Sequence, residues 1–383
     1  MWHLDFIIKL KVILLFNKSN YKKNGYMLNG RFKKRGYDWW WHSFTGIDME
    51  TNEEKAFFIE FFIINPSVSP NEVKYGRLGD IPSYLMIKCG AWGENHAQLH
   101  KFIPLKDVKI AKAPIKIETE DFYLDEFTLR GNIEVIDSQN HPEYMSDNGS
   151  MSFDLKIKKL IAFNVGYGTS GLFRFLKAFE MYWHAEGMKS EYEGLVTFNG
   201  RKYIIKPEKS YGYADKNWGS NFTSPWIWLS SNCLYSKIKN KKLENSVFDI
   251  GGGRPKAFGI PFKSKLLGAF YYEGKEYEYN FSKFYHPSKT FFDCRILDDI
   301  VVWDIKQRDS KSLMETHIEC KKKEMLLVNY EDPKGLKLHN NLYNGGNGYG
   351  YIKIYEKKNG KFELIDDIEV SHVGCEYGEF DKK

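Results

Sequence analysis

The chain has 383 residues, of which 42% are hydrophobic and 28% charged, a balance typical of a globular protein and not of a disordered or fibrous one. Aromatic residues reach 16%, and 32 glycines stand against 12 prolines. Because aromatic residues favour strands and glycines favour tight turns, the composition argues against a helical bundle and for a large all-β protein. The net charge of +6 comes from scattered lysines without a basic arm, which argues against nucleic-acid binding.

The N-terminal segment is apolar over residues 4–16, but an acidic residue and two lysines interrupt it. It is too short to span a bilayer, and no small-residue cleavage site follows it. We therefore expect no integral membrane association, while peripheral association stays open. The pattern that characterises the chain begins near Met27. Residues 1–26 are predicted to be an extension that is disordered or foreign to the native protein, with a leading strand or frayed tail as the alternative.

Strands are predicted along most of the chain. Segment 36–46 holds three consecutive tryptophans, which cannot all face one side of a strand, so one or two must cap a barrel end or enter a pocket. Residues 57–64 form an apolar run of strand length, interrupted only by Glu60, which predicts a strand buried on both faces. Residues 130–135 and 152–157 alternate between polar and apolar side chains, as half-buried strands do.

Turns and one short helix complete the pattern. A helix is predicted over 171–181 from the spacing of its apolar residues. Tight hairpin turns are predicted at 199–200, 273–274 and 359–360, each with glycine second. The three glycines 251–253 lack the context of a phosphate-binding loop, so they are predicted to form a turn.

Many short strands and few helices predict closed or nearly closed antiparallel barrels, which remove free sheet edges. One eight-stranded barrel takes roughly 150 residues, so the chain suits two barrels side by side. We place them at 27–222 and 223–383. The five cysteines are widely spaced without a CxxC pair, which predicts no disulfide framework or zinc site, and reduced thiols in the cytoplasm.

The segment 211–232 is the richest in tryptophan and holds one isolated carboxyl, Asp215. On an extended backbone Tyr213 and Asp215 share one face, and Trp226 and Trp228 share a face of the next strand. A carboxyl in an aromatic pocket resists ionisation and can act as a general acid. Aromatic faces around it would stabilise a carbocation. This suits protonation of an alkene followed by ring closure or hydration, with core packing and a turn as the structural alternative.

A second candidate is the segment 182–187. If it is extended, His184 and Glu186 lie on one face and could form an acid–base pair or orient a substrate oxygen. A structural histidine with its hydrogen bonds satisfied is the alternative. No further ligands stand at a suitable spacing, so a metal site is not predicted.

The segment DKNWG at 215–219 resembles the most specific motif of the tocopherol cyclase family. The resemblance covers residues 27–380 and includes segments 32–42, 183–187 and 374–378. It implies two lipocalin-like barrels, shared with more distant carotenoid hydratases, and cofactor-free chemistry on prenylated or polyene substrates. Plant-type members carry Glu where Asp215 stands, which leaves the substrate open.

The resemblance makes Asp215 the candidate proton donor. Together with the residue patterns, it gives two sets of candidate residues: catalytic Asp215, Tyr213 and His184, and ligand-binding Trp183, Glu186, Trp218, Trp226 and Trp228. No metal or cofactor is expected, and the oligomeric state is not indicated.

Three functions follow from these features. The first is a tocopherol cyclase-like enzyme that catalyses the acid-initiated cyclisation or hydration of a prenylated or polyene lipophilic small molecule. The second is a non-catalytic lipocalin-like carrier, in which Asp215 would only hold a turn at 216–219. The third is a glycan-binding or glycan-cleaving protein. It is disfavoured because glycosidases need two carboxylates about 5–10 Å apart. The only obvious candidates are Asp215 and Glu186, and their surroundings are too apolar. Whether the chain is catalytic stays open from sequence alone.

Overall fold

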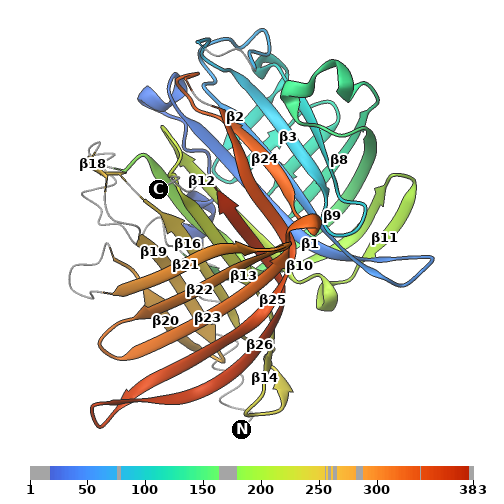
Figure 1. Cartoon of the computed structure of the whole chain (residues 1–383). Coiled ribbons are helices and arrows are strands. Elements are labelled where there is room, and N and C mark those ends of the chain that lie inside the picture. Colours follow the sequence, from blue (N-terminus) through green and yellow to red (C-terminus); the bar gives the residue numbers. More distant parts are fainter. Residues whose placement is uncertain are drawn as a thin grey trace.

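The computed structural model describes residues 18–75, 79–163, 179–254, 256–257, 260–261, 265–281, 288–336 and 338–378. These residues form two large antiparallel sheets, each of which curls into a lipocalin-like barrel, and the two barrels pack side by side (Figure 1). The predicted all-β class and double-barrel architecture are therefore confirmed.

The first sheet has the order β4-β3-β2-β1-β11-β10-β9-β8-β7-β6-β5, and β12 pairs with both β1 and β10. Its strands are β1 (Tyr37–Asp48), β2 (Glu54–Ile64), β3 (Tyr84–Ala91), β4 (Ala97–Ile103), β5 (Lys109–Lys112), β6 (Ile115–Glu118), β7 (Phe122–Asp125), β8 (Thr128–Val135), β9 (Gly149–Phe163), β10 (Met181–Phe198), β11 (Arg201–Ile205) and β12 (Gly212–Gly219).

The second sheet has the order β20-β19-β16-β13-β26-β25-β23-β22-β21, with β14, β15 and β24 attached at its side. Its strands are β13 (Trp226–Ser231), β14 (Cys233–Ser236), β15 (Lys241–Lys242), β16 (Val247–Gly253), β19 (Lys265–Tyr272), β20 (Lys275–Tyr279), β21 (Lys289–Leu297), β22 (Ile300–Arg308), β23 (Ser312–Lys321), β24 (Leu326–Glu331), β25 (Leu338–Lys358) and β26 (Lys361–Gly378). A separate short ribbon pairs β17 (Lys256–Ala257) with β18 (Ile260–Pro261).

Helical structure is short. Among the described residues it consists of α2 (Lys18–Lys23) and 3-10 turns at Gly30–Lys33, Leu105–Asp107, Ser138–Asn140, Pro142–Tyr144, Pro207–Lys209 and Lys322–Glu324. Of the helix predicted over 171–181, residues 171–178 lie outside the described part, and Met181 already begins β10. No helix in the described part of the chain has the length and apolar composition needed to cross a bilayer.

The three predicted hairpin turns are present and join β10 to β11, β19 to β20 and β25 to β26. The first turn residue is left-handed in each case, with φ of 49° at Asn199, 46° at Glu273 and 48° at Asn359. The glycine that follows also has positive φ. Two consecutive left-handed residues match the right-handed twist of the flanking strands, so these pairs fix the register.

Strands β1 and β2 form a wall between two cores because their side chains are apolar on both faces. Trp40 belongs to the core inside the first barrel, whereas Trp39 and Trp41 belong to the layer between the barrels. Residues 57–64 of β2 are buried along their whole length, as predicted. The row of three tryptophans therefore divides by the period of two of a strand, and two of them reach the region between the barrels.

The second barrel reaches back onto the first through β24 (Figure 1). The Lys88 ammonium of β3 donates to the backbone oxygen of Asn329 at 3.1 Å, and the Tyr330 hydroxyl donates to Glu60 Oε2 at 3.1 Å. Lys88 and Glu60 form a fully buried ion pair at 3.3 Å. Hydrogen bonds of this kind between buried groups fix how the two barrels sit against each other.

The turn predicted at Gly251–Gly253 is wrong, because these glycines lie within β16. The structure gives the physical reason. A Cβ on Gly251 would lie 2.9 Å from the Trp183 ring, and one on Gly253 would lie 1.7 Å from the backbone oxygen of Pro225. Glycine is needed here for close approach of a ring and a neighbouring strand, not for a turn.

The connection between the two sheets spans residues 220–225, around the predicted boundary. Asn24 and Gly25 contact the interior of the first barrel, although residues 1–26 were predicted to be an extension. Trp40 Nε1 donates to the Asn24 backbone oxygen at 2.9 Å, and Lys216 donates to that of Gly25 at 2.7 Å. The domain limits at 26 and 222 stay predictions about folding units.

Candidate active site

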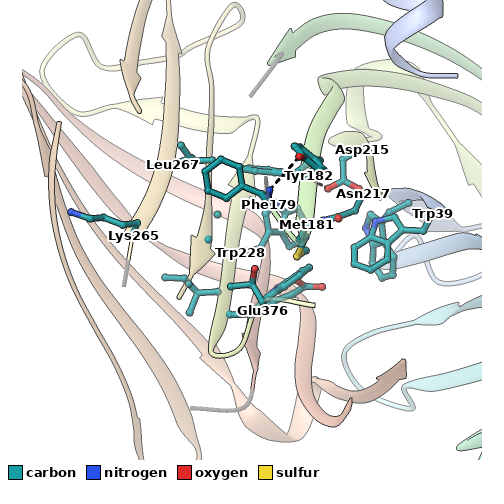
Figure 2. Close-up of a pocket in the computed structure, with 18 of the residues that line it drawn as sticks. Trp39, Phe179, Met181, Tyr182, Asp215, Asn217, Trp228, Lys265, Leu267 and Glu376 are labelled. Carbon is teal, nitrogen blue, oxygen red and sulfur yellow. Dashed lines mark hydrogen bonds between the residues drawn. The ribbon is translucent and has the colours of Figure 1, made fainter. Parts of the chain in front are cut away.

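A cavity of about 110 Å³ lies between the two barrels (Figure 2). Strands β1, β10 and β12 supply one side of it, and β13, β16 and β26 supply the other. Nine aromatic side chains line it: Trp39, Trp41, Phe179, Tyr182, Trp183, Trp226, Trp228, Phe281 and Tyr330. Of the five predicted ligand-binding residues, Trp183, Trp226 and Trp228 line this cavity. Trp39 and Trp41 also line it, and they come from the row of three tryptophans of which one or two were expected to cap a barrel end or enter a pocket.

Asp215 lies on the wall of this cavity and is only 8% exposed. Both of its hydrogen-bond donors converge on one oxygen, Oδ2: the Trp183 indole N–H at 2.7 Å and the Tyr213 hydroxyl at 3.0 Å. The other oxygen, Oδ1, is buried and has no hydrogen-bond partner among the described residues. Burial raises the pKa of Asp215 well above its usual value, although the Trp183 hydrogen bond lowers it. Burial therefore favours the neutral form of this side chain, and one of its oxygens is free of protein partners among the described residues.

Behind Asp215 lies a second carboxyl, Asp249 of β16. The Tyr213 hydroxyl oxygen is 3.0 Å from Asp215 Oδ2 and 3.2 Å from Asp249 Oδ2, and the Trp228 indole N–H donates to Asp249 Oδ1 at 3.0 Å. A phenol carries one hydrogen, so it cannot donate to two carboxylates at once. At least one of the two carboxyls must be protonated to complete the chain. Burial raises the pKa of Asp249 well above its usual value, and ionisation of Asp215 would raise it further, in agreement with this count.

A third carboxyl, Glu376 of β26, also lines the cavity. The Trp226 indole N–H donates to its Oε2, and the Asn344 amide donates to its Oε1 at 2.7 Å. Burial raises the pKa of Glu376 to about 7, against the lowering effect of these two hydrogen bonds. Glu376 belongs to the segment 374–378, which contributes to the family resemblance, but it was not among the predicted site residues.

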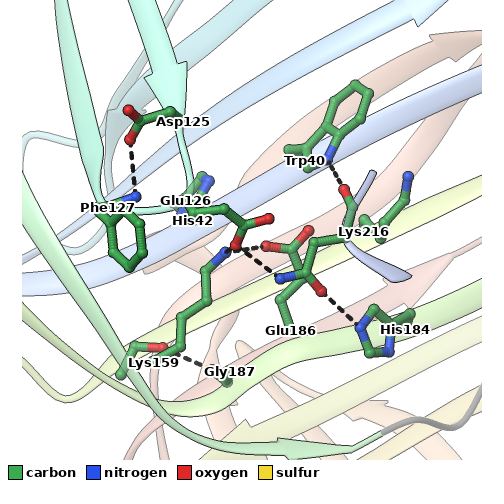
Figure 3. Close-up of polar contacts among 12 residues, drawn as sticks. Trp40, His42, Asp125, Glu126, Phe127, Lys159, His184, Glu186, Gly187 and Lys216 are labelled. Atoms are coloured by element: carbon green, nitrogen blue, oxygen red, sulfur yellow. Dashed lines mark hydrogen bonds and ion pairs between the residues drawn. The ribbon is translucent and has the colours of Figure 1, made fainter. Parts of the chain in front are cut away.

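The remaining candidates lie on the opposite face of the same strands, inside the first barrel (Figure 3). Lys159 bridges Glu186 at 2.6 Å and Glu126 at 2.9 Å. His184 is joined to the same group through Asn24: His184 Nε2 lies 2.9 Å from Asn24 Oδ1, and Asn24 donates to Glu126 at 2.9 Å. His184 and Glu186 thus share one network, but neither lines the cavity that holds the acid.

Lys216 and Trp218 also point into the first barrel. The Lys216 ammonium is bound to Asp38 Oδ1 at 2.7 Å, and Trp218 stacks on Tyr182 at a centroid distance of 5.5 Å. Asp215 is therefore not neutralised by its neighbour in the sequence, and residues 212–219 form a strand instead of the turn that the carrier hypothesis requires. Within β12, alternate residues serve the cavity and the core.

Solved structures to which the chain is similar include kievitone hydratase from Nectria haematococca, with 13% identity and a TM-score of 0.49, covering 91% of each chain. CghA with Sch210972 has 10% identity and a TM-score of 0.46, covering 91% of this chain and 90% of that chain. A protein from Nitrosomonas europaea assigned as AttH has 10% identity and a TM-score of 0.47, covering 93% and 94%.

A comparison with curated protein sequences finds no match. The family model described as Tocopherol cyclase-like matches residues 96–379, more than half of the chain. This range is shorter than the expected range, residues 27–380. It includes the segments 183–187, 215–219 and 374–378, but the segment 32–42 lies outside it. The chain belongs to the tocopherol cyclase-like family.

Proposed function

We propose that this protein catalyses the acid-initiated cyclisation or hydration of a prenylated or polyene lipophilic molecule, without a cofactor, and that Asp215 is the proton donor. One observation carries the proposal. A buried carboxyl faces an aromatic cavity with one oxygen free, while both of its hydrogen-bond donors bind the other oxygen. Such a group suits an acid that must protonate a carbon atom.

The chemistry begins at Asp215 Oδ1. The π electrons of the alkene form a C–H bond with the acid proton while the O–H bond breaks, and the positive charge stays on the more substituted carbon. Trp39, Trp183 and Trp228 line the same cavity, and each ring face that meets the cation would stabilise it by roughly 0.5–2 kcal/mol. A hydroxyl of the substrate or a water molecule then forms the C–O bond and gives up its proton.

The carboxylate that remains keeps its two donors, Trp183 Nε1 and the Tyr213 hydroxyl. Charge-assisted hydrogen bonds are stronger than neutral ones, so both stabilise the charge that develops during protonation. Tyr213 therefore acts through Asp215. Trp183 binds Asp215 and also lines the cavity. For His184 and Glu186 we propose a supporting role, because their network holds β10, the strand that carries Trp183.

The test uses geranylhydroquinone as a probe in D2O. The wild-type protein is expected to form a ring-closed isomer carrying one non-exchangeable deuterium, or a product heavier by one water, as measured by mass spectrometry. Asp215→Asn is expected to bind the probe, seen as tryptophan quenching, without forming product. Asp299→Asn, which changes an exposed carboxyl, serves as the control.

Two results would count against the proposal. Full product formation by Asp215→Asn would remove Asp215 as the acid. Binding of the probe by the wild-type protein with no product and no deuterium uptake would favour the carrier function instead.

A further inference from the structure

We infer that Glu376 is the base that removes the proton from the attacking hydroxyl group or water, so that each barrel supplies one half of an acid–base pair. The inference rests on the proposed function and extends it to a residue that has no assigned role.

Position is the first argument. Glu376 lies on β26 opposite Trp228 of β13, and both side chains line the cavity that Asp215 lines from the first barrel. Figure 2 shows Asp215 and Glu376 approaching the cavity from different strands. The carboxyl is 7% exposed, so a ligand in the cavity, not bulk water, is its natural partner. The negative charge of Glu376 raises the pKa of Asp215, which places the two groups within electrostatic reach.

The hydrogen bonds separate the roles of the two carboxyls. Each oxygen of Glu376 accepts an N–H, one from Trp226 and one from Asn344, so a proton on either oxygen would compete with a donor. Asp215 differs, because both of its donors bind Oδ2 and Oδ1 is left to carry a proton. Donors spread over both oxygens favour a carboxylate, whereas donors on one oxygen leave room for an acid.

The surrounding charges do not neutralise Glu376. Two charged groups act on it from the first barrel, Glu60 of β2 and Lys88 of β3, and these are paired with each other at 3.3 Å. Burial is the largest cause of the raised pKa of Glu376. Glu60 raises this pKa further and Lys88 lowers it, and the resulting value is about 7. The group can therefore both hold and release a proton near neutrality.

The step balances in protons and electrons. As the hydroxyl oxygen forms the new C–O bond, its O–H bond breaks and the proton passes to Glu376. The cycle ends with neutral Glu376 and ionised Asp215, and transfer of one proton between them restores the starting state. Neither a redox partner nor a cofactor takes part.

The test compares Glu376→Gln with Glu369→Gln, an exposed glutamate of the same strand. With geranylhydroquinone in D2O, Glu376→Gln should form product about 100-fold more slowly or worse, as expected for loss of a general base. The recovered probe should still gain deuterium, because Asp215 continues to protonate the alkene reversibly. Glu376→Asp, which keeps a carboxylate, should recover part of the rate. Glu369→Gln should match the wild type.

A second readout needs no substrate. Because Trp226 donates to Glu376, tryptophan fluorescence of the wild type should change with a midpoint near pH 7, and Glu376→Gln should lack this transition. Wild-type rate in Glu376→Gln, or an unchanged titration, would overturn the inference. If the wild-type protein itself incorporates no deuterium, the proposed function fails instead, and the two failures are distinguishable.

Discussion

Removal of the Tyr213 hydroxyl tests how much its hydrogen bond contributes to the acidity of Asp215. In Tyr213→Phe, the carboxylate formed at Asp215 loses one of its two hydrogen-bond donors and keeps only the Trp183 indole. A hydrogen bond to a charged group contributes about 1.5–3 kcal/mol. If the whole bond is present in the transition state, alkene protonation should slow by roughly 10- to 150-fold. The Tyr213 hydrogen bond lowers the pKa of Asp215, so its loss also makes Asp215 a weaker acid.

The rate of deuterium uptake from D2O into geranylhydroquinone measures this effect directly. Tyr279→Phe is the control, because Tyr279 is also fully buried and hydrogen-bonded through its hydroxyl, to Ser312 at 3.1 Å, but belongs to the core of the second barrel. Both variants should lose comparable stability, and only Tyr213→Phe should lose rate. An unchanged rate in Tyr213→Phe, or an equal loss in both variants, would refute the reasoning.

Two further predictions concern groups outside the cavity. Lys159→Met leaves Glu126 and Glu186 buried without their cation, which should lower the free energy of unfolding by about 3–5 kcal/mol. Burial raises the pKa of Glu186 to about 7, so folding of the protein favours the protonated form of this carboxyl relative to the unfolded chain. The loss should therefore be larger at pH 8 than at pH 5.5 in urea denaturation, and a loss independent of pH would contradict this account. Burial alone would raise the pKa of Cys233, but hydrogen bonding to His372 lowers it below the usual value. Cys233 should be the first of the five thiols alkylated by iodoacetamide at pH 7, and mass spectrometry that finds another thiol faster would disprove it.

Much of the fold could be predicted because its signals are local. The apolar run 57–64 needs no knowledge of its partners to be recognised as a doubly buried strand, and a turn such as 199–200 follows from two backbone conformations. The shared face of Tyr213 and Asp215 follows from the period of two of a strand, and the structure joins the two side chains by a hydrogen bond of 3.0 Å. Gly251–Gly253 shows the limit, because glycines chosen for close packing look the same in sequence as glycines in a turn.

The rest of the site depends on contacts between distant segments. Asp249 meets Asp215 only through Tyr213, and Glu376 reaches the same cavity from the last strand, so no local pattern joins them. Strand irregularity adds a second reason. The pairing of β10 with β12 shifts register between His184 and Gly187, and the side chains of His184 and Glu186 enter the first barrel instead of the cavity. A sequence pattern cannot reveal which of the two faces of a strand meets a ligand when both are buried.

Infrared difference spectroscopy tests the central claim most directly. The spectrum of the wild-type protein minus that of Asp215→Asn at neutral pH isolates the vibrations of one carboxyl, without any substrate. A neutral acid held in the aromatic cavity should give a positive carbonyl band of a protonated carboxyl group. A carboxylate band in its place would show that Asp215 is ionised before substrate binds, and would contradict its role as the proton donor.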